Sequence, residues 1–162
     1  MATAMNRAQT CECHRLPAEQ PVWVRDLLSG GSAIDQQAER LARLRRDVVV
    51  QPTIYVGAGT CGLGAGAART LAAIRRYLES HKLDAEIIEV GCIGLCAAEP
   101  LVDVQLPGRT RLCFRGVTEN KVDDLLDKVL AGEVPTERVL AQFRPAAGAA
   151  TQPQPWPAVP YL

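Results

Sequence analysis

The sequence has few aromatic residues, no excess charge and no long apolar run. Phe, Trp and Tyr make up 4% of its 162 residues, although 48% are hydrophobic, so a core must be built mainly from aliphatic side chains. Eighteen basic residues balance eighteen acidic ones, which argues against a protein that binds nucleic acid by neutralising phosphates. No apolar run approaches the roughly 18 residues that a membrane-spanning helix needs, so we expect no direct membrane insertion.

The first residues also lack the apolar stretch of a secretory signal peptide, because residues 1–7 read MATAMNR. We therefore expect a cytoplasmic protein. Disulfides are rare in that compartment, so the six cysteines are interpreted as metal ligands, redox thiols or core residues. The length suits one domain of ordinary size with a tail.

Composition divides the chain into three parts. Residues 1–47 are predicted to be an N-terminal extension with one helix, which begins after a capping Ser32 and ends near Asp47. Residues 48–135 carry the alternating and helical apolar patterns of a folded core. Residues 136–162 are rich in proline and alanine, and we predict a semi-rigid linker there because no core can form in the proline-rich tail.

The pattern within the central part predicts the element order β-α-β-β-β-α. A glycine-rich turn (57–66) follows the first strand, and Pro107-Gly108 joins the last two strands as a hairpin. The expected strands are 53–56, 85–90, 101–106 and 111–117, and the expected helices are 67–80 and 119–131. Such elements pack as an α/β fold, a four-stranded mixed sheet flanked by two helices, which is the thioredoxin-like arrangement.

Two cysteines lie in a glycine-hinged loop after the second strand. Three residues separate Cys92 from Cys96, and Gly91 and Gly94 let the backbone turn both sulfurs toward one point. This spacing suits an iron–sulfur ligand pair at least as well as a dithiol. Ile93 and Leu95 would shield the sulfurs, and N–H groups near Gly94 could donate hydrogen bonds to them. The alternative interpretation is two small core residues at a strand end.

A third cysteine, Cys61, lies in the glycine-rich segment after the first strand. The ends of two neighbouring parallel strands lie close together in a β-α-β unit. We therefore expect Cys61 to face Cys92 and Cys96 across a gap that could hold a cluster.

Residues 59–63 (GTCGL), the helix after them and residues 91–102 (GCIGLCAAEPLV) resemble the thioredoxin-like [2Fe-2S] ferredoxin domain. That domain occurs at the N-terminus of flavoprotein subunits in NADH dehydrogenases, NAD-linked formate dehydrogenases and bidirectional hydrogenases. The resemblance covers about residues 50–135. Residues 155–162 look like the link into the flavin and NADH domain of such subunits, which implies that this chain is a front piece without that domain.

The resemblance implies a C-x4-C ligand pair in the first loop and a C-x3-C pair in the second. The second pair matches Cys92 and Cys96, whereas the positions of the first pair hold Gly57 and Gly62, with Cys61 one residue early. The fourth ligand is therefore open. Cys113 is a poor candidate because it lies in the middle of an expected strand, and nothing places the remaining candidates, Cys11, Cys13 and His14, near the loops.

The same glycines also fit a different site. Gly57, Gly59 and Gly62 match the G-x-G-x-x-G dinucleotide fingerprint between a strand and a helix, and Glu89 could bind a ribose. The helix N–H groups after Gly66 could hold a pyrophosphate. The hairpin that follows argues against this interpretation, because a dinucleotide site needs a second β-α-β unit.

The functional hypothesis is an electron-transfer [2Fe-2S] domain of an NADH-dependent oxidoreductase, with Cys61, Cys92 and Cys96 as metal ligands. It would pass single electrons to or from a flavin or iron–sulfur centre of a neighbouring domain or subunit. FMN and NADH would bind only on the missing flavoprotein domain, so we expect no catalytic or flavin-binding residue here. Two alternatives are a cluster-free docking module of the same complex and a nucleotide-binding fragment.

Overall fold

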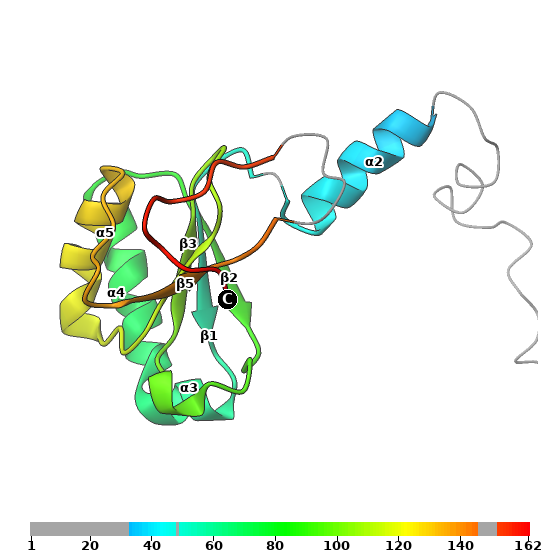
Figure 1. The fold of residues 1–162 in the computed structure, drawn as a ribbon. Helices are drawn as coiled ribbons and strands as arrows, with labels where there is room; N and C mark the ends of the chain where they lie inside the picture. Colours follow the sequence, from blue (N-terminus) through cyan, green and yellow to red (C-terminus); the bar gives the residue numbers. More distant parts are fainter. Residues whose placement is uncertain (1–32, 48, 146–151) are drawn as a thin grey trace, which may run out of the picture. The chain divides into compact units, whose positions relative to one another are not determined.

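The computed structural model describes residues 33–47, 49–145 and 152–162 (Figure 1). Its contacts divide the chain into one unit up to Leu41 and a second from Ala42 to Leu162. The described residues of the first unit belong to helix α2 (Ala33–Leu44), where the sequence predicts the N-terminal helix. Among the helices that the model describes, none is both long and apolar enough to cross a membrane.

The second unit is built on a mixed β-sheet with the strand order β2-β1-β3-β4-β5. β1 pairs in parallel with β2, and the remaining neighbours are antiparallel. The strands are β1 (Thr53–Gly57), β2 (Glu86–Val90), β3 (Val102–Gln105), β4 (Leu112–Phe114) and β5 (Val139–Gln142). The predicted β-α-β unit and the hairpin after it are thereby confirmed.

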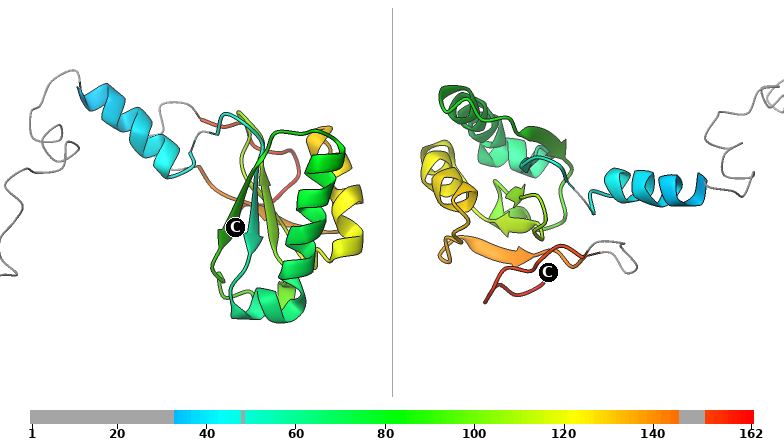
Figure 2. Two further views of the ribbon diagram at one scale, coloured as in Figure 1. Left: turned by 180° about the vertical axis from the view of Figure 1, so that it is seen from behind. Right: turned by 90° about the horizontal axis from the view of Figure 1, so that it is seen from above.

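Two helices, α4 (Ala67–Ser80) and α5 (Val122–Leu130), lie on the same face of this sheet (Figure 2). The 3-10 turn η3 (Glu119–Lys121) leads into α5, so the helix begins slightly later than expected. Alternate residues of the strands point toward the helices, and the residues between them in β1, β3 and β4 are buried as well. The resulting core includes Ile54, Val56, Leu71, Ile74, Val102, Val104, Phe114, Leu125 and Leu126.

The sheet has one strand more than the sequence predicts. β5 (Val139–Gln142) comes from residues 136–162, which were expected to be a linker, and it pairs with β4. The proline-rich composition misled the prediction because the run from 139 to 142 contains no proline and needs only one partner strand to be ordered.

A buried glutamine attaches the C-terminal residues to this strand. The Gln142 side chain accepts hydrogen bonds from Thr110 Oγ1 (2.6 Å) and Trp156 N (2.9 Å), and it donates to the carbonyls of Trp156 (3.0 Å) and Val159 (2.6 Å). The backbone N–H of Gln142 donates to Pro160 O, and its carbonyl accepts from Leu162 N. Trp156 is 3% exposed. Residues 152–162 are therefore packed on the domain, whereas their role as a link to a flavin domain stays a prediction.

One packing contact between the helices predicts a pH dependence. The Tyr77 hydroxyl donates to Asp127 Oδ1 (2.6 Å), and burial, followed by this hydrogen bond, raises the pKa of Tyr77 from 10 to about 12. The folded state therefore favours the neutral phenol, and this stabilisation is complete below pH 10 and is lost as the pH rises from 10 to about 12. Urea unfolding should show a steeper loss of stability in this range for the wild type than for Tyr77→Phe. Tyr161→Phe, at an exposed tyrosine, is the control, and equal slopes in all three proteins would contradict the assignment.

Candidate metal centre

Two loops leave the sheet at the ends of its parallel strands, β1 and β2. Gly57 pairs with Val90 at the last position of the register, and Ala58 N donates to Val90 O (2.8 Å). The loops then stay in close contact, because a Cβ at Gly59 would lie 3.0 Å from the backbone nitrogen of Cys92. The parallel pairing thus places both cysteine-bearing segments at one end of the sheet.

The first loop folds into a short helix, where the sequence predicts a turn. Helix α3 (Thr60–Ala65) carries Cys61 in its first turn and ends at Gly66, whose φ of +102° joins α3 to α4. Gly62 of this helix packs against β1, and a methyl group there would overlap the carbonyl oxygen of Gly57. The close packing of Gly62 fixes the position of Cys61 above the strand end.

The second loop holds its two cysteines as a pair. The Sγ atoms of Cys92 and Cys96 are 3.6 Å apart, and the 3-10 turn η2 (Cys96–Ala98) begins at the second of them. Gly94 adopts a φ of +89° and its N–H donates to Cys92 Sγ (3.3 Å), which is the kind of hydrogen bond that the sequence predicts. Hydrogen bonds of this kind stabilise a thiolate and tune a metal bound to it.

The structure brings the three predicted cysteines together. The Sγ atoms of Cys61, Cys92 and Cys96 all lie within 4.8 Å of one another, and none of the three forms a disulfide. Soft thiolate ligands at this spacing suit iron, zinc or copper(I). The arrangement is therefore a candidate metal centre with three sulfur donors.

The three thiols are exposed, which corrects two expectations. The interpretation of Cys92 and Cys96 as buried core residues is wrong. The shielding role expected of Ile93 and Leu95 is also not seen, because these side chains are themselves 47% and 41% exposed.

Among the other sulfur and nitrogen candidates, the structure describes only Cys113, and this residue does not extend the group. Cys113 is fully buried in β4, and burial and then the nearby Asp103 carboxylate raise the pKa of its thiol. That thiol is therefore held in its neutral form, which does not bind metal. Cys11, Cys13 and His14 lie outside the described residues, so the structure leaves their roles open.

The acidic side chain of Glu99 packs against Gly57 and Gly62. Glu99 Oε2 accepts a hydrogen bond from Leu101 N (2.7 Å), and Glu99 Oε1 is buried without a hydrogen-bond partner. Cβ atoms at Gly57 and Gly62 would lie 2.9 Å and 3.3 Å from Glu99 Oε2. Sequence reasoning missed this residue, because its contacts with Gly57 and Gly62 join distant parts of the chain.

The dinucleotide interpretation receives little support from the site. The expected ribose ligand, Glu89, forms an ion pair with Arg75 of α4 (3.3 Å). The glycine fingerprint opens the short helix α3 and not the long helix α4, and the sheet continues with a hairpin where a second β-α-β unit would be needed.

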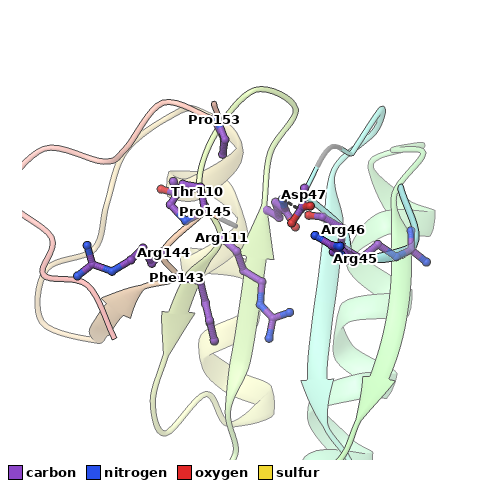
Figure 3. A pocket seen from close by; sticks show the side chains of 10 residues that line it. Arg45, Arg46, Asp47, Thr110, Arg111, Phe143, Arg144, Pro145 and Pro153 are labelled. Atoms are coloured by element: carbon purple, nitrogen blue, oxygen red, sulfur yellow. Dashed lines mark hydrogen bonds between the residues drawn. The ribbon is translucent and has the colours of Figure 1, made fainter. Parts of the chain in front are cut away.

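A separate hollow of about 180 Å³ has arginine side chains on its wall (Figure 3). Arg46 pairs with Glu86 through two hydrogen bonds (2.6 and 2.7 Å), and Arg111 pairs with Asp103 (2.6 Å). Arg111 also lies over the rings of Tyr55 and Phe143. Arg46 and Arg111 are thereby neutralised within the chain, and Arg45 and Arg144 also line the hollow.

No protein-family model matches this chain. Among curated proteins, the NADP-reducing hydrogenase subunit HndB of Solidesulfovibrio fructosivorans is 30% identical over 88 residues, which are 54% of this chain and 70% of that protein. Among solved structures, a thioredoxin-like [2Fe-2S] ferredoxin from Aquifex aeolicus has a TM-score of 0.50 and 18% identity, and the match covers 61% of this chain and 98% of that one. A 1.5 Å structure of the wild-type ferredoxin from the same organism gives 0.50 and 19%, over 57% and 99%. The structural matches confirm the predicted thioredoxin-like α/β fold.

Proposed function

This chain belongs to the thioredoxin-like [2Fe-2S] ferredoxin family, and from that premise we propose that it transfers single electrons, with Cys61, Cys92 and Cys96 holding a [2Fe-2S] cluster. The observation that carries the proposal is the approach of the three Sγ atoms to within 4.8 Å of one another. A bound cluster supplies one reversible electron at a time, with a potential set by its ligands, hydrogen bonds and exposure to water.

The chain's own residues account for binding and for access to a partner. Cys92 and Cys96 supply neighbouring thiolates from one loop, and Cys61 supplies a third from α3. The N–H of Gly94 donates to the sulfur of Cys92, which stabilises its negative charge. The exposure of all three thiols leaves the site open to a partner centre.

The partners that fit this role are the other subunits of a multi-subunit, NAD(P)H-linked oxidoreductase, because the relative at 30% identity is named as a subunit of an NADP-reducing hydrogenase. A flavin and the nicotinamide cofactor would then bind on a neighbouring flavoprotein domain. Single electrons would pass between that domain and this one, in a cytoplasmic complex.

A second candidate is a docking module without a cluster in the same complex. It is favoured by one observation, namely that Gly57 and Gly62 occupy the positions where the family pattern places its first two ligands. The two candidates differ in metal content alone and not in fold.

Anaerobic reconstitution of the full chain with iron and sulfide separates them. We expect about two irons and two sulfides per chain and, after reduction with dithionite, a rhombic EPR signal of a [2Fe-2S]⁺ centre. The same chain treated with an iron chelator before reduction is the control. A reconstituted chain that retains no iron or sulfide and gives no signal would leave the docking module as its function.

A further inference from the structure

We propose that Cys92 and Cys96 form a reversible disulfide when the metal-free chain meets a peroxide, with Cys92 as the reacting thiol and Cys96 as its resolving partner. The inference goes beyond the proposed function, because it concerns the chain before a metal binds and needs no cluster. Three observations carry it: the 3.6 Å between the two sulfurs, their exposure, and the open space around the glycines of their loop.

The two sulfurs are close enough to bond after a small movement. Their Sγ atoms are 3.6 Å apart, and a disulfide brings such atoms to about 2.0 Å. Only three residues separate the two cysteines, so closing this ring costs less chain entropy than joining distant parts of the chain. The pair is therefore placed to react within its own loop.

The loop also has room for this movement. A Cβ at Gly91 or Gly94 would meet no atom within 4 Å beyond its chain neighbours, and Gly94 has a φ of +89°. The side chains of Ile93 and Leu95 are 47% and 41% exposed, so neither anchors the loop in the core. The loop can draw its two sulfurs together without disturbing the sheet.

Cys61, the third sulfur of the site, belongs to a different segment. It lies in α3, whose Gly62 packs against the carbonyl oxygen of Gly57. A disulfide to Cys61 would have to pull this helix and the second loop together, and the backbone contact at Gly62 resists that movement. We therefore expect Cys61 to stay a free thiol when the pair oxidises.

The hydrogen bond from Gly94 selects Cys92 as the reacting sulfur. Its nitrogen lies 3.3 Å from Cys92 Sγ, and the N–H stabilises negative charge there. Cys92 Sγ attacks one oxygen of hydrogen peroxide, the O–O bond breaks, and a sulfenic acid forms with release of water. Cys96 Sγ then attacks the sulfur of the sulfenic acid, the S–O bond breaks, and the hydroxyl leaves as water with the Cys96 proton. Two thiols thus lose two electrons to give one disulfide, and the peroxide is reduced to two waters.

The resolving thiol protects an exposed cysteine from lasting damage. A sulfenic acid without a neighbouring thiol is open to further oxidation to sulfinic acid, which is not generally reversible. Condensation with Cys96 ends instead at a disulfide, which a thiol reductant reverses by exchange. The disulfide also removes two of the three sulfur donors, so it and a metal at this site exclude each other.

The test treats the reduced, metal-free full-length chain with hydrogen peroxide, alkylates the remaining thiols and maps the tryptic peptides. Residues 83–109 form one tryptic peptide that contains Cys92 and Cys96, whereas Cys61 lies in the peptide of residues 47–69. We expect the first peptide to escape alkylation and to be lighter by two hydrogens than its reduced form, and the second to be alkylated at Cys61. Dithiothreitol added before alkylation should restore both thiols of the first peptide.

Two variants, Cys96→Ser and Cys61→Ser, separate the roles of the three thiols. Cys96→Ser lacks the resolving thiol, so we expect dimedone to trap at least about tenfold more sulfenic acid at Cys92 than in the wild type. Cys61→Ser should form the disulfide as fast as the wild type does. Circular dichroism of both variants reports folding.

Three results would overturn the inference. They are a wild type whose peptide 83–109 stays fully alkylated after peroxide, a wild type in which this peptide is cross-linked to residues 47–69, and equal dimedone labelling of the wild type and Cys96→Ser. None of them depends on iron. A chain that forms the disulfide but takes up no iron keeps this inference and loses the proposed function, and a chain that binds a cluster but forms no disulfide does the reverse.

Discussion

Replacing Cys96 with alanine is expected to abolish cluster binding, whereas the same change at Cys113 should leave the iron content of the reconstituted chain unchanged. Cys96 lies 3.6 Å from Cys92 and within 4.8 Å of Cys61, so its loss removes one of three sulfurs that converge on one point. Cys113 is buried in β4 beside Asp103, and its raised pKa keeps it a neutral thiol. The pair thus compares two cysteines of one domain, only one of which lies at the proposed site.

Iron and sulfide analysis with visible absorption after anaerobic reconstitution measures the effect. Iron per chain should fall from about two to near zero in Cys96→Ala, and Cys61→Ala and Cys92→Ala should behave alike. Unfolding curves of the metal-free proteins should overlap for the three exposed positions, since none contributes to the core. Equal iron retention in Cys96→Ala and Cys113→Ala would show that the converging sulfurs do not bind the metal.

Gly62→Ala is expected to destabilise the domain strongly, whereas Gly64→Ala, two residues away on the same helix, should not. A methyl group at Gly62 would overlap the carbonyl oxygen of Gly57 and lie 2.9 Å from its carbon, and backbone atoms cannot move aside as a flexible side chain can. Overpacking of this kind typically costs about 1–3 kcal/mol. A Cβ at Gly64 would meet no atom within 4 Å beyond its chain neighbours and its own helix backbone, so alanine there should stabilise α3 by up to about 1 kcal/mol.

Urea unfolding of the metal-free variants gives this difference as a shift of the midpoint at constant slope. Since Cys61 precedes Gly62 directly, the reconstituted Gly62→Ala chain should also lose iron to a chelator faster than Gly64→Ala. Similar midpoints for the two variants would mean that α3 tolerates a shift away from β1, and the contact would then not fix the first loop.

The element order and the meeting of the two loops could be predicted because each depends on local patterns and one rule of chain geometry. The alternation in residues 101–106 and the helical stripe of α5 are periodic over several residues. Cys61 could be placed opposite Cys92 and Cys96 because parallel strands joined through a helix end at the same edge. This placement alone was enough to predict that the Sγ atoms of the three cysteines converge.

The fifth strand and the packing of Glu99 against the first loop could not be predicted, because both depend on distant partners. β5 is four residues long and is held by β4 and by hydrogen bonds to residues 156–162, none of which leaves a periodic pattern. Glu99 lies in a non-repeating turn, and its side chain packs against Gly57 and Gly62, which are distant in the sequence. A single sequence contains no signal for contacts of that kind.

The attachment of the C-terminal residues to β5 affects how the protein associates. β5 is the outer strand of the sheet, and its Gln142 exchanges backbone hydrogen bonds with Pro160 and Leu162. A version of the protein shortened before residue 152 would free the backbone N–H and C=O of Gln142 at the outer edge of this strand. Unpaired groups at a sheet edge can pair with strands of other molecules. Residues 152–162 therefore protect this edge from aggregation in addition to completing the fold.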